Sequence, residues 1–386
     1  MKITAGPPAR GENFFDRENI IQKAWDLIES GNHILIAAPR RVGKTSVMYY
    51  LQDNPKDGFD FLFLDTESVN NENEFFRRIV NKLLKADSVR SSQKISAFLK
   101  KYLPSIKKIG PDGVEFGTKD DLNYLELLEN ILKSISDDKK KIVIMLDEFS
   151  QTLENIINDE GEAAGKHFLY SNRELRQDVE VSKNVHFIYT GSIGLENIVS
   201  RMNAIKSIND LSRLVVNPLT TAEAKNLVRL LIKNVEFEFP EPLIDYILQK
   251  IEWFIPYYIQ LIVQELKDLH REEKLADITE QSIDRAFEVM LTQRHHFEHW
   301  HTRLRAALKG DEYNFSKEIL NIISENEIIH SNEIFNIAVK YKLENTFKDI
   351  IGSLIYDGYI NNNEEPSVYR YNSPILRMWW RQNVAN

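Results

Sequence analysis

A chain of 386 residues exceeds the size of one ordinary hydrophobic core, so we expect two or three domains. With 42% hydrophobic and 10% aromatic residues the composition excludes a disordered chain, and the lack of cysteine excludes disulfides, thiolate metal sites and a cysteine nucleophile. The net charge of −9 argues against a generally basic surface for nucleic acid, so any DNA-binding role needs a local patch. No stretch approaches the roughly 20 apolar residues that span a bilayer, and the N-terminus lacks the apolar core of a secretory signal. We expect a cytoplasmic protein without membrane contact.

The first half of the chain alternates short apolar segments with amphipathic ones. The apolar segments predict buried strands at His33–Ala37, Phe59–Leu64, Lys141–Leu146, Val185–Thr190 and Leu214–Val216. The amphipathic segments predict helices, among them Glu18–Glu29, Glu72–Lys85 and Leu122–Ser136. This βαβ pattern predicts an α/β domain with a parallel sheet over residues 1–218.

The first predicted strand runs into a segment rich in basic and small residues, Ala38–Thr45. It follows the phosphate-loop pattern of Gly, four residues, then Gly-Lys-Ser/Thr, except that Ala38 stands at the first glycine. Gly43 would let backbone N–H groups close around phosphate oxygens, Lys44 would reach the β- and γ-phosphates, and Thr45 would offer a hydroxyl to Mg²⁺. An ordinary strand-turn-helix junction is the alternative. The predicted nucleotide contacts here are Pro39, Arg40, Arg41, Val42, Gly43, Lys44, Thr45 and Ser46.

Two later strands end in polar residues that suit the same site. The segment KIVIMLDEF ends in Asp147, which would hold Mg²⁺ through water, and Glu148, which would polarise an attacking water. The segment VHFIYTGS ends in Thr190, Gly191 and Ser192, and we assign Thr190 to sensing the γ-phosphate. A solvated Asp-Glu pair and an ordinary Thr-Gly-Ser turn are the alternatives.

Beyond Pro218 the strands give way to helical periodicity. The segment TTAEAKNLVRLLIKN, with Thr220 or Thr221 as its cap, opens a predicted helical lid over residues 219–292. The segment QRHHFEHWHTR then predicts a linker helix within residues 293–314. Its histidines could form a metal face, but the interleaved Phe297 and Trp300 favour a packed helix; the histidines are His295, His296, His299 and His301.

Residues 315–386 show short helices followed by the segments GYI and VYRYN, which predict a hairpin and together a winged-helix domain. A recognition helix near ENTFKDIIGSLIYDG, with Arg370, Arg377 and Arg381, would suit DNA. That helix carries as much acid as base, however, so an intramolecular lever is the alternative. We expect Met378, Trp379 and Trp380 to pack inside the domain.

With these elements in order, the chain resembles the prokaryotic AAA-like P-loop ATPases called the archaeal-ATPase or MNS family, which are related to the STAND ATPases. The resemblance lies in NFFDRENI, APRRVGKTS, VIMLDEF, IYTGSIGLE and WFIPYYIQ, from about Asn13 to Gln260. It implies that Phe15 and Arg17 lie against the nucleotide base and that Pro256 approaches the nucleotide from the lid. Two segments depart from the family pattern. Ala38 stands in place of a glycine and could strain the loop, and Trp253–Ile255 stands in place of a Gly-rich turn. The resemblance also makes Arg201 and Arg213 candidates for an arginine supplied across a subunit interface, with surface ion pairs as the alternative.

The expected architecture is thus a P-loop parallel sheet with a helical lid and a C-terminal winged helix. The expected function is a switch that binds and hydrolyses ATP with Mg²⁺ and moves its lid and winged helix, passing output to a protein partner or a second copy of itself. A switch with negligible turnover and a DNA-binding regulator that uses ATP for assembly are the alternatives.

Overall fold

The computed structural model describes residues 1–3, 5–15, 17–86, 89, 106–110, 113–116, 122–135, 140–191, 194–233, 235, 237, 239–273 and 277–385. The chain forms two compact units, each treated by itself below. The sheet unit comprises Asp16–Ala38 and Lys44–Val216, and the lid unit comprises Met1–Phe15, Pro39–Gly43 and Asn217–Asn386. The predicted division at residues 218, 292 and 314 stays a prediction, and Ser192 lies outside the described residues.

The sheet unit is built on a five-stranded parallel sheet in the order β2-β5-β6-β1-β7. Four predicted strands are confirmed, and the fifth begins earlier than predicted. β7 starts at Leu211, and its first residues were missed because it is an edge strand. Its half-exposed Ser212 and exposed Arg213 interrupt the apolar pattern on which the prediction relied. A hairpin, β3–β4, was not predicted. The strands are β1 (His33–Ala37), β2 (Phe59–Asp65), β3 (Ile106–Gly110), β4 (Gly113–Phe116), β5 (Lys141–Asp147), β6 (Val185–Thr190) and β7 (Leu211–Val215).

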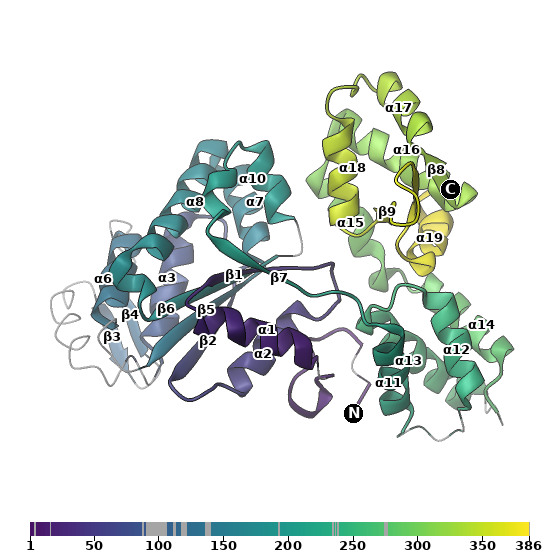
Figure 1. Cartoon of the computed structure of the whole chain (residues 1–386), viewed down its shortest axis with the longest axis horizontal. Helices are drawn as coiled ribbons and strands as arrows, with labels where there is room; N and C mark the ends of the chain where they lie inside the picture. Colours follow the sequence, from purple (N-terminus) through teal and green to yellow (C-terminus); the bar gives the residue numbers. More distant parts are fainter. Residues whose placement is uncertain are drawn as a thin grey trace. The chain divides into compact units, whose positions relative to one another are not determined.

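Helices cover both faces of this sheet, as parallel strands require. In Figure 1, α1 and α2 lie on one face, and α3, α6, α7 and α8 lie on the other. α3 ends two residues before its predicted end because Leu84 and Lys85 form a turn. The helices of this unit are α1 (Glu18–Glu29), α2 (Lys44–Asp53), α3 (Glu72–Leu83), α6 (Tyr124–Ile135), α7 (Phe149–Glu160), α8 (Glu162–Gln177), α9 (Val179–Ser182), α10 (Leu195–Arg201) and the 3-10 turn η3 (Ile205–Ile208).

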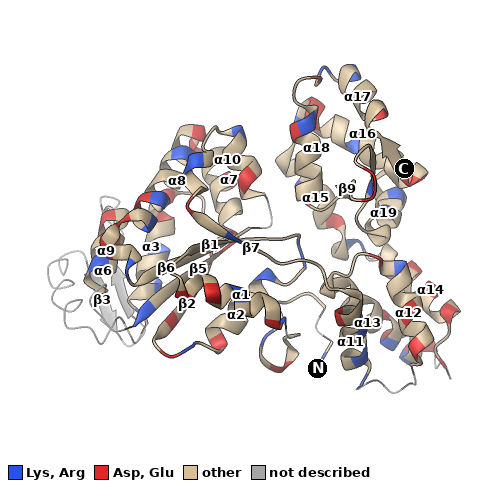
Figure 2. Ribbon diagram, in the orientation of Figure 1, with Lys and Arg blue, Asp and Glu red and all other residues tan. Residues whose placement is uncertain are grey.

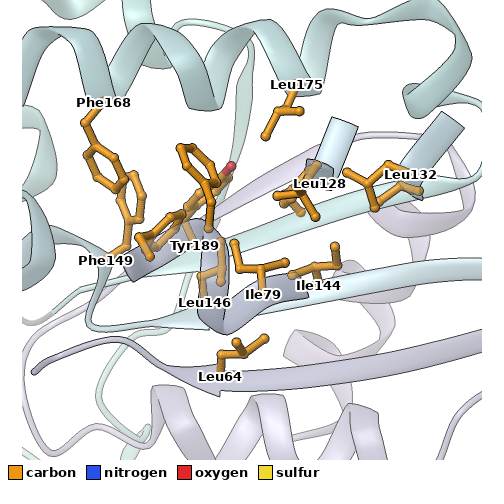
Figure 3. Packing of buried hydrophobic residues seen from close by; sticks show 14 of the residues in the cluster. Leu64, Ile79, Leu128, Leu132, Ile144, Leu146, Phe149, Phe168, Leu175 and Tyr189 are labelled. Carbon is orange, nitrogen blue, oxygen red and sulfur yellow. The ribbon is translucent and has the colours of Figure 1, made fainter. Parts of the chain in front are cut away.

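The core of the sheet unit fills the space between the sheet and the helices α3, α6, α7 and α8 (Figure 3). Aromatic rings from three helices and one strand meet there. Phe168 contacts Phe75 edge-on at 4.8 Å between centroids and stacks on Phe149 at 5.2 Å, and Phe149 contacts Tyr189 at 4.7 Å. Such pairs add about 0.5–1.5 kcal/mol each beyond the buried area. β5 and β6 pair side by side beneath this cluster, and both strands end at the candidate site.

Two buried histidines lie on neighbouring strands of this sheet, His33 on β1 and His186 on β6, with ring centroids 6.1 Å apart. The Nδ1 atom of His33 accepts from the Phe187 N–H at 3.1 Å, so its Nε2 donates to the Arg176 carbonyl at 3.0 Å. Neither ring nitrogen of His186 has a hydrogen-bond partner among the described residues. Burial lowers the pKa of each histidine to about 4, so both are neutral in the folded chain.

Stability should therefore fall as the pH drops from about 6.5 towards 4. In that window an unfolded histidine, with a pKa near 6.5, binds a proton that the folded one does not, which is worth up to about 3 kcal/mol for each residue. Replacement His186→Phe should reduce this acid-induced loss, while the exposed His167→Gln should not. Urea unfolding at pH 7.5 and 4.5 measures the effect, and an unchanged pH dependence in His186→Phe would contradict it.

The lid unit begins with the short turn η1 (Gly11–Asn13) and continues, after Asn217, with helices in series. A capping box between Thr220 and Glu223 starts the first of them, so Thr220 is the cap. The helices are α11 (Thr221–Ile232), α12 (Glu241–Ile251), α13 (Pro256–Glu273), α14 (Glu280–Thr292), the turn η4 (Arg294–His296) and α15 (Glu298–Ala307). Phe297 and Trp300 are buried, as the packed-helix interpretation of this segment predicts. The part of the chain that the structure describes holds no group of three metal-ligating side chains.

The C-terminal part of this unit is a winged helix, in which helices pack around the antiparallel sheet β8-β10-β9. Its elements are α16 (Gly310–Asn326), β8 (Ile328–His330), α17 (Ser331–Lys340), α18 (Phe347–Tyr356), β9 (Ile360–Asn361), β10 (Val368–Tyr371), α19 (Pro374–Trp380) and the π-helical turn Arg381–Ala385. Trp379 and Trp380 are fully buried, and Met378 is half-buried. α19 contacts α16 and also the lid helices α12 and α14, so the winged helix and the lid share packing. No helix among the described residues is long and apolar enough to cross a membrane.

Candidate functional site

Three predicted site residues meet at the carboxyl end of β5. The Thr45 hydroxyl, in the first turn of α2, donates to Asp147 Oδ2 at 2.6 Å. The Thr190 hydroxyl, at the end of β6, donates to Asp147 Oδ1. Parallel strands present their carboxyl ends at one edge, which explains why residues from β5, β6 and the helix after β1 converge there.

Asp147 is buried, with 5% of its surface exposed. Burial raises the pKa of its carboxyl above the ordinary value, and the neighbouring Glu148 charge acts in the same direction. The hydrogen bonds from Thr190 and Thr45 and the charge of Lys44 oppose that rise. Additional positive charge at this carboxylate would therefore be favourable.

Two further threonines hold the strand end, and sequence reasoning missed both. The backbone N–H and hydroxyl of Thr66 donate to the Asp147 carbonyl at 3.0 and 2.8 Å. The Thr152 hydroxyl, from α7, donates to the Thr66 carbonyl at 2.6 Å. Thr66 could have been found, because it follows a predicted strand and so lies at the same sheet edge. Nothing in the sequence singles out Thr152.

Lys44 begins α2 and is buried, with its Nζ donating to the Ala38 carbonyl at 3.1 Å. Ala38 does not have a positive φ, whereas Gly43 has a φ of 105°. The first glycine of the pattern is therefore dispensable for the backbone here, while the second is required. Strain in the loop lies instead at Arg41, which is left-handed with a φ of 64°.

Glu148 also has a left-handed backbone, with φ 56° and ψ 32°, at the point where β5 turns into α7. Its N–H donates to Asp147 Oδ1 at 3.1 Å, and its side chain is half-buried. A left-handed backbone is costly for a residue with a side chain, and such strain is concentrated at functional sites. The turn places Glu148 directly after the buried carboxylate.

The rest of the phosphate loop, Pro39–Gly43, belongs to the lid unit. The Arg41 guanidinium lies 4.1 Å from the centre of the Tyr257 ring, in the first turn of α13 beside Pro256. The Tyr257 hydroxyl contacts His296 Nδ1 at 2.6 Å, and His296 Nε2 contacts Gln293 Oε1 at 2.7 Å. Because that amide oxygen only accepts, Nε2 carries the proton and Tyr257 donates to Nδ1. The loop is thereby linked to α13 and to the turn after α14.

The turn before Pro256 forms without glycine. Glu252 adopts a left-handed conformation, with a φ of 52°, and ends α12. The Ile255 N–H then donates to the Trp253 carbonyl at 2.7 Å. A positive φ at Glu252 thus lies directly before Trp253–Ile255, the segment where a Gly-rich turn was expected.

The remaining predicted residues belong to other elements of the sheet unit or to the lid unit. Phe15 is half-buried in the lid unit, and Arg17 is buried at the start of α1. Their contact with a nucleotide base stays a prediction. Arg201 is exposed at the end of α10, and Arg213, with 52% of its side chain exposed, donates to Glu196 at 2.8 Å.

The parallel sheet order β2-β5-β6-β1-β7, with Lys44 and the buried Asp147 at its carboxyl edge, is that of a P-loop-like α/β fold. Residues 9–188 match the model of the AAA-ATPase-like family, described as predicted AAA-ATPases. The resemblance to AAA-like ATPases seen in the sequence is therefore confirmed, and this part of the chain carries the family's pattern.

Solved structures extend the likeness to the whole fold. A Walker-type ATPase of Pyrococcus abyssi is 18% identical, with a TM-score of 0.66 over 99% of this chain and 100% of that chain. The ORC2 protein of Aeropyrum pernix, in its ADPNP-ADP complexes, is 11% identical, with a TM-score of 0.58 over 95% of this chain and 93% of that chain. At these identities the likeness concerns the fold, including the C-terminal winged helix. No curated protein sequence matches this chain.

Proposed function

We propose that the chain binds ATP with Mg²⁺ and hydrolyses it, and that the nucleotide state controls the lid and the winged helix. The observation that carries this proposal is the convergence of the Thr45 and Thr190 hydroxyls on the buried Asp147 carboxylate. Lys44, one residue before Thr45, donates to the Ala38 carbonyl, and a phosphate oxygen can take the place of that carbonyl.

The residues fit a magnesium ion. Mg²⁺ prefers oxygen ligands and is usually held by one or two protein groups, with water and substrate phosphates as the others. Thr45 and Asp147 supply one hydroxyl and one carboxylate 2.6 Å apart. A bound Mg²⁺ would neutralise phosphate charge, and it would favour the ionised form of Asp147, which burial disfavours.

The remaining residues take separate roles in this proposal. Lys44 neutralises the β- and γ-phosphates, and Glu148 orients the attacking water by accepting its proton. Thr190 responds to the γ-phosphate through Asp147. The loop residues Pro39, Arg40, Arg41, Val42, Gly43 and Ser46, with Phe15, Arg17 and Pro256, would contact the rest of the nucleotide.

The contact between Arg41 and Tyr257 supports the switch. Phosphate binding at the loop would draw the Arg41 guanidinium away from the ring, because an ion pair with phosphate exceeds a cation–π contact worth about 0.5–2 kcal/mol. Tyr257 and its partner His296 would then be free to shift with α13 and the turn after α14. Output would pass to a protein partner or a second copy of the chain.

DNA contact receives little support from the winged helix. Two arginines suggested for it are paired, Arg370 with Glu364 at 2.7 Å and Arg377 with Glu327 at 2.8 Å. Figure 2 shows acidic and basic residues interspersed over the helices of this domain. We propose instead that the winged helix acts as an intramolecular lever. Stimulation of ATP turnover by duplex DNA would contradict this proposal.

Steady-state ATP turnover with Mg²⁺ tests the function. We expect the intact protein to turn over ATP, and Lys44→Ala to lose both binding and turnover, because phosphate charge would lose its buried counter-ion. Lys166→Ala removes a half-buried lysine of α8 that pairs with Glu162 at 2.7 Å in its own helix, and it should behave as the intact protein. ATP retention without turnover would select the non-hydrolysing switch, and no binding by the intact protein would refute the proposal.

A further inference from the structure

Arg303 is a buried arginine in α15 whose hydrogen bonding is incomplete. Its side chain is 6% exposed, and Nη2 donates to Asp357 Oδ1 at 3.0 Å. Its Nε and Nη1 atoms are buried and have no hydrogen-bond partner among the described residues. A buried N–H without a partner leaves the cost of its desolvation uncompensated, and that cost is larger when the group is charged. Such a group therefore calls for an explanation, and a bound anion is one.

The Asp357 that holds Arg303 lies beside the phosphate loop. Asp357 ends α18, and Gly358 follows it with a φ of 84°. A Cβ at Gly358 would lie 3.5 Å from Pro39 Cβ and 2.9 Å from the Trp253 ring. The turn after α18, at Gly358, therefore contacts both Pro39 of the phosphate loop and Trp253, which precedes α13.

Trp300 of α15, three positions before Arg303, also packs against Trp253 and against the turn after α18. The Trp300 ring lies 6.5 Å from the Trp253 ring and 5.0 Å, edge-on, from the Tyr359 ring. The Tyr359 hydroxyl also donates to the Trp300 carbonyl at 2.7 Å. α15, the turn after α18 and the phosphate loop thus meet within the lid unit.

Positive charges from the loop and from α15 act together there. His299, one helical turn before Arg303, has its pKa lowered to about 3 by burial and by the charges of Arg40, Arg41 and Arg303. Burial raises the pKa of Tyr359, and the charges that act on this buried hydroxyl include both Arg303 and Arg40. The charges of Arg40 and Arg303 thus act on both buried groups, in agreement with the contact between Gly358 and Pro39.

We propose that Arg303, together with Arg40 and Arg41, forms a binding site for a phosphate group, and that the phosphate competes with Asp357 for Arg303. A phosphate group suits the site because its oxygens accept several N–H bonds at once and match the planar guanidinium fork. Its source is the terminal phosphate of the nucleotide, which rests on the proposed function, or free inorganic phosphate. Occupation would loosen the hold of Arg303 on Asp357 and so release the turn that contacts Pro39.

Calorimetric titration of four variants with ATP, ADP, AMP and inorganic phosphate tests the site. Arg303→Gln should weaken ATP binding about tenfold or more, since a hydrogen bond to a charged group contributes about 1.5–3 kcal/mol. Arg303→Lys should fall between, because lysine lacks the fork. Asp357→Asn should strengthen binding severalfold by removing the competing carboxylate. Arg305→Gln, an exposed arginine of the same helix, should change nothing.

The Arg303 variants should weaken ATP binding and Asp357→Asn should strengthen it, and these opposite changes in affinity distinguish an effect on binding from an effect on folding. If the ion pair were purely structural, both variants would melt at a lower temperature and bind more weakly, and that result would overturn the site. The site would also be overturned if Arg303→Gln and Arg303→Lys bound ATP and phosphate within twofold of the intact protein. Weakened phosphate binding with unchanged ATP binding would assign the site to free phosphate. If the intact protein bound no nucleotide, the proposed function would fail, and the phosphate titration would still decide on the site.

Discussion

Replacing Glu148 with Gln should lower ATP turnover by about 10²–10⁴-fold while ATP remains bound. The carboxylate of Glu148 directly follows the buried Asp147, in a strained left-handed turn. Glutamine has the same shape but cannot accept the proton of an attacking water. The phosphate contacts of Lys44 and Thr45 would be untouched, so binding should persist.

Single-turnover kinetics and a measurement of retained nucleotide check this prediction. Glu160→Gln, an exposed glutamate at the end of the same helix, is the matched control and should keep full turnover. Equal turnover in Glu148→Gln and the intact protein would show that another residue handles the water. Loss of both binding and turnover would show that Glu148 shapes the site instead.

Replacing Arg176 with Met should destabilise the protein by about 3–5 kcal/mol. Arg176 on α8 has 2% of its side chain exposed, and its Nε and Nη2 donate to Asp210 at 2.7 and 2.9 Å. Nη2 also donates to the Ser207 carbonyl at 2.7 Å. Although burial favours the neutral acid, the hydrogen bond and charge of Arg176 hold the pKa of Asp210 below its ordinary value. Methionine would leave that carboxylate uncompensated.

Urea unfolding of single and double variants measures the effect. The double variant Arg176→Met with Asp210→Leu should regain much of the loss, because no unpaired charge remains. The exposed pair of Arg229 and Glu241 offers a contrast, since Arg229→Met should leave the unfolding midpoint unchanged. A loss below about 1 kcal/mol in Arg176→Met would mean that water reaches the pair.

Local patterns predicted the elements well where one face of the chain is consistently apolar. The helix Glu18–Glu29 and the strand Val185–Thr190 have the predicted bounds, since each is periodic along its whole length. β7 was predicted too short, because an edge strand alternates polar and apolar residues and loses its signal at the exposed end. The strain expected at Ala38 lies at Arg41, since backbone conformation depends on the path of the loop rather than on its pattern.

The sequence by itself determined the α/β class, the phosphate-loop pattern at the start of α2, and the acidic end of β5, because each depends on neighbouring residues and periodicity. Only the tertiary structure decided which groups support them. The Thr66 bond to Asp147 joins residues 81 positions apart, and the Arg41 stack on Tyr257 and the Arg303 bond to Asp357 join other separate elements. Such pairs are chosen by the packing of whole helices and strands, so no local pattern records them.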